Sequence, residues 1–387
     1  MKIPYYKIEN HRNEIKYLKN VLSSGWYSTG PKSFELEKKF SEFISVKYAL
    51  SVSSCTSALH LAFRAINLKK GDKVIVPTTN FISSFEAIEY CGATPILADV
   101  EYGTSNISII SLKNLIKKYA NIKAIVVVHF GGQVSSLYSK KNKLFLNEIK
   151  KRKIKIIDDA AHAFPSKYNK TFVGNFADIT CFSFYANKTI TAGEGGMITT
   201  NNKKYASRIK LLRLHGIDRD VWTRFTSIKK SKWEYDIVEN GYKYNLSDLN
   251  AAVCLAHLEK AEIMRKKREK IARFYIKELK DVKAIDLPEL NVPMKDHSWH
   301  LFIIKINSHT KIIRNELIDL LDDHGIGTSV HYKPIHRMTY YKKNYKFNKN
   351  FKNAEMIWKN CISLPIYSLL TMVQARFIVN KIKFHLK

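Results

Sequence analysis

The sequence predicts an α/β protein built around a mainly parallel β-sheet. From about residue 33 to residue 200, short apolar segments alternate with segments whose apolar residues recur at helical spacing. This alternation is typical of βαβ units. The chain has 387 residues, of which 45% are hydrophobic. It is therefore long enough for two or three domains and for a core that needs no disulfide or metal.

The elements of this region are predicted from apolar spacing, β-branched runs and flanking Gly or Pro residues. In chain order they are helix 32–43, strand 48–52, helix 56–66, strand 72–76, helix 81–90, strand 94–99, helix 112–119, strand 124–129, helix 140–152, strand 154–158 and strand 197–200. Ligands of parallel sheets bind outside the carboxyl ends of the strands. The functional residues are therefore sought in the loops that follow these strands.

The C-terminal third is predicted to form a second, smaller domain. A long helical stretch over residues 248–280, with Ser247 as its N-cap, is expected to connect the two domains. The large domain would then comprise residues 1–250, and the smaller one residues 251–387. Within the smaller domain we predict strands 300–306 and 327–332 and helices 315–324 and 371–384.

The chain is strongly basic. It carries 65 Lys and Arg residues against 34 Asp and Glu residues, which gives a formal net charge of +31. The excess is mostly lysine, is spread along the chain and comes with no nucleic-acid-binding signature, so we expect a solvated surface and no nucleic-acid partner. Such a positive field would also raise the local concentration of an anionic substrate.

The sequence also predicts the compartment. Its apolar runs fall far short of the ~18 residues that a membrane span needs, and the N-terminal residues lack the apolar core of a signal peptide. Its five cysteines form no CxxC pair, which argues against a disulfide framework or a zinc cluster: they are Cys55, Cys91, Cys181, Cys254 and Cys361. We expect a cytoplasmic protein that has no membrane partner and no metal site.

Two segments contain groups suited to acid–base and imine chemistry. Ser183 and Lys188 precede the glycine-rich run 193–196, and a desolvated lysine can form a Schiff base with an aldehyde cofactor. A surface lysine before a turn is the alternative. Asp159 and His162 follow the strand 154–158, where a carboxylate could pair with a protonated pyridine nitrogen. A helix cap with a buried polar histidine is the alternative there.

Two further segments contain groups suited to phosphate binding and ring stacking. Ser54, Cys55 and Thr56 lead into the helix 56–66, and hydroxyls with free amides at a helix N-terminus bind phosphate. Simple N-capping is the alternative. Phe81 lies in a loop after a strand, where it could stack on an aromatic ring or belong to the core. Together the four segments would form a complete site for pyridoxal 5'-phosphate (PLP).

These motifs resemble those of the DegT/DnrJ/EryC1/StrS family of PLP-dependent nucleotide-sugar aminotransferases, and the resemblance covers nearly the whole chain. The further matching segments are SGWYSTGP at 24–31, LHG at 214–216, GYKYNLSD at 241–248, HSWHLF at 297–302, GIGTSVHY at 325–332 and SLP at 363–365. Within the family, the KYNLSD and WHLF segments look most like members that aminate a UDP-4-keto-pentose. Other parts, such as VHYKP at 330–334, also resemble the members that act in pseudaminic acid biosynthesis.

The resemblance implies PLP fold type I, with a mostly parallel seven-stranded sheet in the large domain and a smaller α/β domain. It implies a homodimer with shared active sites. Lys188 would bind the cofactor aldehyde and Asp159 its pyridine nitrogen, with His162 near the ring oxygen. The residues implied to complete the site are Ser54, Cys55, Thr56 and Ser183 at the phosphate, Phe81 on the ring, Lys243 and Asn245 reaching the partner's site, and Trp26, Tyr27, Thr29, His331 and His336 near the sugar.

By the same resemblance, the protein would move an amino group from glutamate to a nucleotide-linked keto-sugar. A UDP- or dTDP-4-keto sugar destined for a surface glycan or lipid A is expected. The alternative is a PLP-binding relative without transaminase activity, such as a dehydratase-like or regulatory protein. In family relatives that became dehydratases a histidine replaces the lysine, whereas this chain retains Lys188.

Overall fold

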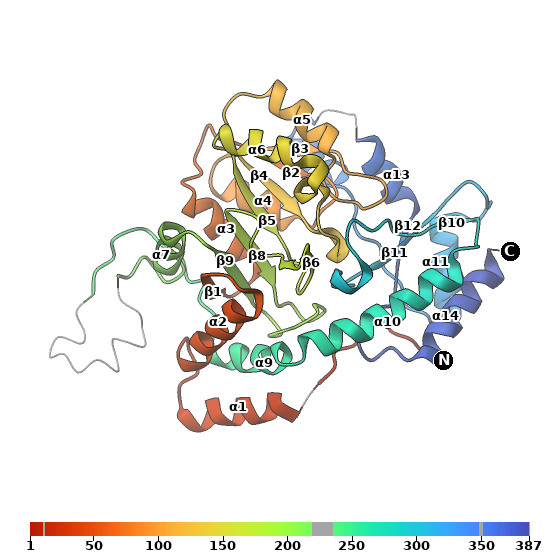
Figure 1. The fold of residues 1–387 in the computed structure, drawn as a ribbon, viewed down its shortest axis with the longest axis horizontal. Coiled ribbons are helices and arrows are strands. Elements are labelled where there is room, and N and C mark those ends of the chain that lie inside the picture. The colour runs from red at the N-terminus through yellow and green to blue at the C-terminus, as the bar shows by residue number, and fades with distance from the viewer. Residues whose placement is uncertain (11, 219–234, 348–350, 387) are drawn as a thin grey trace.

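A seven-stranded sheet forms the centre of the computed structural model, which describes residues 1–10, 12–218, 235–347 and 351–386 (Figure 1). The strand order is β1-β9-β8-β5-β4-β2-β3. Neighbours from β8 to β3 are parallel, whereas β9 runs antiparallel to β8 and β1. The predicted mainly parallel sheet is therefore confirmed. Its strands are β1 (Tyr48–Val52), β2 (Lys73–Pro77), β3 (Thr94–Ala98), β4 (Ile122–Val128), β5 (Lys155–Asp159), β8 (Ile179–Ser183) and β9 (Gly196–Thr200).

Helices cover both faces of this sheet, because its strands alternate apolar residues between two cores. Val126 of β4 packs in the core formed with α3 and α4, whereas Val127 packs in the core formed with α5 and α6. A third core joins the edge of the sheet to α2 and α9. The helices are α1 (Arg12–Ser24), α2 (Pro31–Ile44), α3 (Cys55–Ala65), α4 (Ser83–Tyr90), α5 (Ile109–Lys118), α6 (Lys143–Lys151), α7 (Lys203–Leu212) and α9 (Asp248–Leu258).

The C-terminal residues form a separate core around a three-stranded antiparallel sheet in the order β10-β11-β12. Ile3 also lies in this core and pairs with Ile326, so the first residues of the chain pack against its C-terminal part. The remaining elements are α10 (Ala261–Leu279), β10 (Ile285–Asp286), β11 (Phe302–Ile306), α11 (Arg314–Asp323), α12 (Thr339–Asn344), α13 (Lys352–Asn360), β12 (Cys361–Leu364), α14 (Met372–His385) and the hairpin β6 (Lys167–Tyr168) and β7 (Thr171–Phe172).

Two predicted elements are wrong. The helix predicted over 248–280 is two helices, since Lys260 leaves the helical region (φ −113, ψ 7) between α9 and α10. The first half packs on α1 and α2 and the second in the C-terminal core, so the chain bends between two packing partners (Figure 1). The predicted Ser247 cap is confirmed. The strand predicted over 327–332 reduces to an isolated bridge between Ser329 and Ser363.

The topology gathers the loops after β2, β4, β5 and β8 at one edge of the sheet, as parallel strands require. The N-terminus of α3 follows β1 beside them. No helix in the described part of the chain is long and apolar enough to cross a membrane.

Candidate functional site

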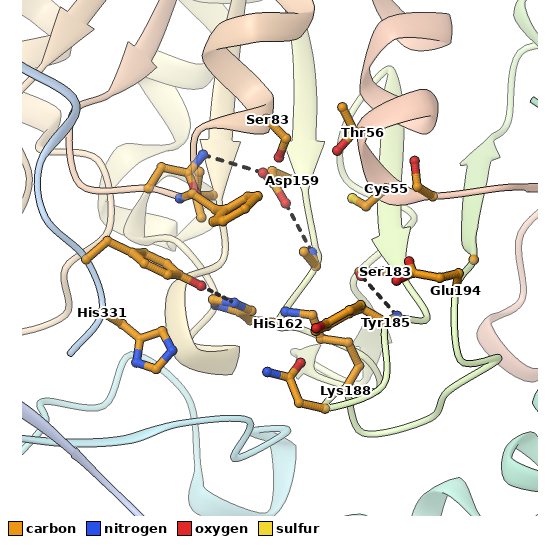
Figure 2. Close-up of a pocket in the computed structure, with 18 residues that line it drawn as sticks. Cys55, Thr56, Ser83, Asp159, His162, Ser183, Tyr185, Lys188, Glu194 and His331 are labelled. Carbon is orange, nitrogen blue, oxygen red and sulfur yellow. Dashed lines mark hydrogen bonds between the residues drawn. The ribbon is translucent and has the colours of Figure 1, made fainter. Parts of the chain in front are cut away.

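A cavity of about 480 Å³ opens at this edge (Figure 2). Thr56, Ser183 and Glu194 lie on one side of it, and His162 and His331 on the other. The residues around it are Ser54, Cys55, Thr56, Asn80, Phe81, Ser83, Val128, Asp159, Ala161, His162, Ser183, Tyr185, Asn187, Lys188, Glu194, Gly195, His331 and Tyr332. The fold thus brings all four sequence-predicted segments to one cavity.

Lys188 lies in the loop between β8 and β9, which is closed by backbone bonds from Phe184 to Gly195 and from Ala192 to Phe184. Its amine faces the cavity (Figure 2). Burial lowers the pKa of Lys188 to about 8, although Cys55 and Asp159 act in the opposite direction. An amine with this pKa is partly neutral near pH 7.5, as nucleophilic attack on an aldehyde requires.

Asp159 ends β5 and is buried. Its Oδ2 accepts a hydrogen bond from Ser84 Oγ at 2.6 Å, and the Asn80 amide lies 3.5 Å away. The Ala161 amide donates to Oδ1 at 3.2 Å. These donors fix the carboxylate at the bottom of the cavity, where it could hold a protonated ring nitrogen.

His162 lies beside the lysine as a neutral imidazole. Burial, followed by Lys188 and His331, lowers its pKa well below the usual value. Its Nδ1 accepts from the Gly131 amide at 3.2 Å, so the proton is on Nε2, which lies 3.2 Å from the Tyr332 hydroxyl. A neutral ring with a fixed tautomer can donate one hydrogen bond in a defined direction.

The first turn of α3, which is predicted to hold a phosphate, lines the cavity. The Ser54 side chain caps the helix by accepting from the Ser57 amide, while the amides of Cys55 and Thr56 precede it, where helix geometry gives them no backbone partner. Gly196 permits this packing, because a Cβ there would lie 2.7 Å from the carbonyl of Ser54. The turn and the Ser183 hydroxyl line one wall of the cavity, which suits a phosphate.

Phe81 and Tyr185 lie at the mouth of the cavity. Their side chains are 56% and 46% exposed, which rules out the core alternative for Phe81. An aromatic ring left this exposed beside a cavity is suited to stacking on a flat ligand.

These groups together fit PLP: a cradle for its phosphate, a carboxylate for its ring nitrogen, a neutral histidine, an aromatic lid and a partly neutral lysine within one cavity.

Several sequence-predicted residues lie outside the lining of this cavity. Asn245 joins two of these residues, Lys243 and Thr29. Lys243 Nζ donates to Asn245 Oδ1 at 2.7 Å, and Asn245 Nδ2 donates to Thr29 Oγ1 at 2.6 Å. Trp26 Nε1 donates to the Thr29 carbonyl at 3.0 Å, and Tyr27 is 48% exposed. The structure therefore brings Trp26, Thr29, Lys243 and Asn245 into a second cluster.

His336 is also apart from the cavity lining. Its Nδ1 lies 2.7 Å from Thr78 Oγ1 and its Nε2 lies 2.6 Å from Glu355, while its ring stacks on Phe351. Both ring nitrogens are thus occupied within the chain, and the predicted contact of His336 with sugar stays a prediction. His331, by contrast, lines the cavity, and its predicted place near the sugar stays a prediction.

Sequence reasoning missed some residues of the site. Tyr332, Asn80 and Ser84 contact the predicted groups, and His300 lies 3.5 Å from Lys188 Nζ. Asn80 and Tyr332 are neighbours of predicted residues, so adjacency could have indicated them. His300 comes from a segment far away in the sequence, and only the folded chain shows the contact.

The comparisons with known proteins agree with one another. The family model described as DegT/DnrJ/EryC1/StrS aminotransferase family matches residues 9–383. The chain is 36% identical over 368 residues to spore coat polysaccharide biosynthesis protein SpsC of Bacillus subtilis, covering 94% of this chain and 92% of that protein.

Solved structures are similar over nearly their full length. The putative sugar aminotransferase Spr1654 of Streptococcus pneumoniae in its PMP form has a TM-score of 0.89 and 29% identity, with 99% and 98% of the two chains covered; its PLP form is also solved. Helicobacter pylori PseC, an aminotransferase involved in the biosynthesis of pseudoaminic acid, has a TM-score of 0.88 and 28% identity, with 100% and 99% covered.

Proposed function

The chain belongs to the DegT/DnrJ/EryC1/StrS aminotransferase family, and from this premise we propose that it transfers an amino group from glutamate to a nucleotide-linked keto-sugar. It is a PLP-dependent enzyme with PLP fold type I. The proposal rests on one observation: Lys188, with its lowered pKa, lies in the same cavity as Asp159 and the first turn of α3.

Two relatives support a sugar as the acceptor. PseC acts in the biosynthesis of pseudoaminic acid, and SpsC in that of a coat polysaccharide. The net charge of +31 would favour the approach of a nucleotide diphosphate. We propose a UDP- or dTDP-4-keto sugar as the acceptor, with surface glycan or lipid A synthesis in the cytoplasm as the pathway.

Each side chain has a distinct proposed task. PLP, when bound, supplies an electron sink for the carbon that loses its proton. Asp159 would keep the ring nitrogen protonated, and Lys188 would hold the aldehyde and, as a free amine, act as the base that moves the proton. The first turn of α3 and Ser183 would bind the phosphate, while Phe81 would cover the ring and exclude water.

We propose that the second cluster serves the active site of a partner subunit. Trp26, Thr29, Lys243 and Asn245 contact one another but do not line the cavity of their own chain. In a homodimer with shared sites, Lys243 and Asn245 would reach the partner's cofactor phosphate. When a Lys243→Ala subunit is mixed with a Lys188→Ala subunit, each heterodimer should then hold one intact site of two and regain about half of the activity of a wild-type dimer, as measured in exchanged dimers.

The test of the activity begins with the visible absorbance of the purified protein. A yellow protein that bleaches on addition of glutamate and releases 2-oxoglutarate supports the proposal, and UDP- and dTDP-4-keto sugars are then screened as acceptors. Lys188→Ala should abolish turnover, and Asp159→Asn should remove most of it while keeping part of the cofactor. A yellow protein that does not respond to any donor favours the relative without transaminase activity.

A further inference from the structure

A strained turn brings a histidine from the C-terminal part of the chain to the cavity. Trp299 is fully buried and adopts the left-handed region (φ +53), which is unfavourable for a bulky side chain. The turn is held by the Trp299 amide, which donates to His297 Nδ1 at 2.8 Å, and by the Trp299 indole, which donates to the Met294 carbonyl at 3.0 Å. Strain of this kind persists only where the surroundings fix it, and it is concentrated at functional sites.

The turn is also tied to the loops that surround the cavity. Ser298 Oγ donates to the carbonyl of His162 at 2.6 Å, and the Leu301 amide donates to the carbonyl of Gly131 at 3.1 Å. Gly132 permits this approach, because a Cβ there would overlap with Ser298 Oγ. One flank of His300 is therefore anchored to the segment that carries His162, and the other to the loop of Gly131, whose amide binds His162.

The turn places the imidazole of His300 directly beside Lys188. His300 Nε2 is 3.5 Å from Lys188 Nζ, and its ring centroid is 4.4 Å from that of His162. The side chain is buried, and its Nδ1 has no hydrogen-bond partner among the described residues. Lys188 Nζ is thus the polar group that His300 faces.

The direction of the contact follows from the protonation states. Burial, followed by Lys188 and His162, lowers the pKa of His300 well below its usual value, so the ring is neutral. A lysine ammonium can only donate hydrogen bonds. Toward the ammonium form of Lys188, Nε2 is therefore the acceptor, and the ring proton is on Nδ1.

We infer that His300 is a positioning residue for Lys188: its Nε2 accepts a hydrogen bond from Nζ and holds the amine against the cavity wall whenever the amine is not bonded to the cofactor. The inference rests on the proposed role of Lys188. With one N–H of the neutral amine directed to His300, its lone pair is free to face the cavity. In the proposed reaction, this is the side from which Lys188 would take up the substrate proton.

The same contact would add to the charge balance of the lysine. Cys55 of α3 and Asp159 of β5 favour the ammonium, while burial disfavours it. His162 and His331 also face Nζ, and both are neutral because burial and Lys188 lower their pKa. A neutral acceptor stabilises an ammonium more than an amine, so removing the His300 acceptor should lower the pKa of Lys188.

The experiment measures this titration at Lys188 itself. Cofactor-free protein is mixed briefly with PLP between pH 6 and 10 and reduced with borohydride, and the label on Lys188 is quantified by mass spectrometry. The pH at which labelling is half-maximal gives the pKa of the free Lys188 amine. His300→Gln and His300→Asn form the decisive pair, because the Gln oxygen reaches the position of Nε2 and the shorter Asn oxygen reaches only that of Nδ1. His60→Phe, at a buried histidine that contacts Tyr244, is the control.

We expect the labelling midpoint of His300→Asn to lie about one pH unit below that of the wild type. The midpoint of His300→Gln should lie close to that of the wild type, because its oxygen replaces the lost acceptor. With glutamate, kcat of the Asn variant should fall about tenfold with little change in KM, since the lost contact acts on proton transfer. A midpoint shared by the wild type and both folded variants overturns the inference. Wild-type protein that takes no label on Lys188 overturns the proposed site instead, which separates the two failures.

Discussion

The burial of Lys188 predicts that the cofactor-free protein becomes more stable as the pH rises. Its folded pKa is about 8 against a usual value of 10.5, so the unfolded chain binds more protons between these values and stability increases with pH. The shift of about 2.5 units corresponds to a penalty of about 3 kcal/mol at pH 7, which falls to about 1 kcal/mol at pH 10.

The perturbation that isolates this penalty is Lys188→Met, which keeps the length of the side chain and removes its charge. Urea unfolding of the cofactor-free wild type and variant is measured from pH 7 to pH 10. Titrating groups that do not contact Lys188 are common to both proteins and cancel in the difference. The histidines beside it titrate below this pH range. The free energy of unfolding of the wild type should rise relative to the variant by about 2 kcal/mol over this range.

The matched control is Lys38→Met on α2, where the side chain is exposed. This variant reports what a lysine that stays in water contributes to the pH dependence. A difference between wild type and Lys188→Met that is flat from pH 7 to pH 10 would refute the reasoning, because Nζ would then be solvated in the folded protein. A difference that falls with pH would show that the ammonium is stabilised in the cavity.

Three further substitutions test the other walls of the cavity. Gly196→Ala places a Cβ 2.7 Å from the carbonyl of Ser54, so it should cost about 1–3 kcal/mol in unfolding experiments and weaken PLP binding in an absorbance titration. Phe81→Ala removes the exposed lid and should weaken PLP binding about tenfold at most, with an unchanged melting temperature. Ser84→Ala removes a 2.6 Å bond to Asp159 and should lower kcat about tenfold, whereas unchanged kcat would show that the Asn80 and Ala161 amides suffice.

The local pattern predicted most of the central sheet. The strand 48–52 matches β1 residue for residue, and strands such as 94–99 and 154–158 are within one residue of β3 and β5. Short apolar runs between amphipathic helices leave little freedom for the chain, because each run can be buried only between two helical layers. The predicted helix 248–280 is wrong, because the break at Lys260 depends on packing partners that no local sequence pattern records.

The residue types and motifs of the sequence by themselves determined the chemistry of this protein. Lys188, Asp159, His162 and the serine-rich start of α3 are each adjacent to a strand end, and the carboxyl ends of parallel strands must meet. Only the tertiary structure decided that Phe81 is exposed, that His336 is held by Thr78 and Glu355, and that His300 faces Lys188. The contacts of His336 with Thr78 and of His300 with Lys188 join residues more than a hundred positions apart. The exposure of Phe81 is a property of the folded chain that spacing along the sequence does not encode.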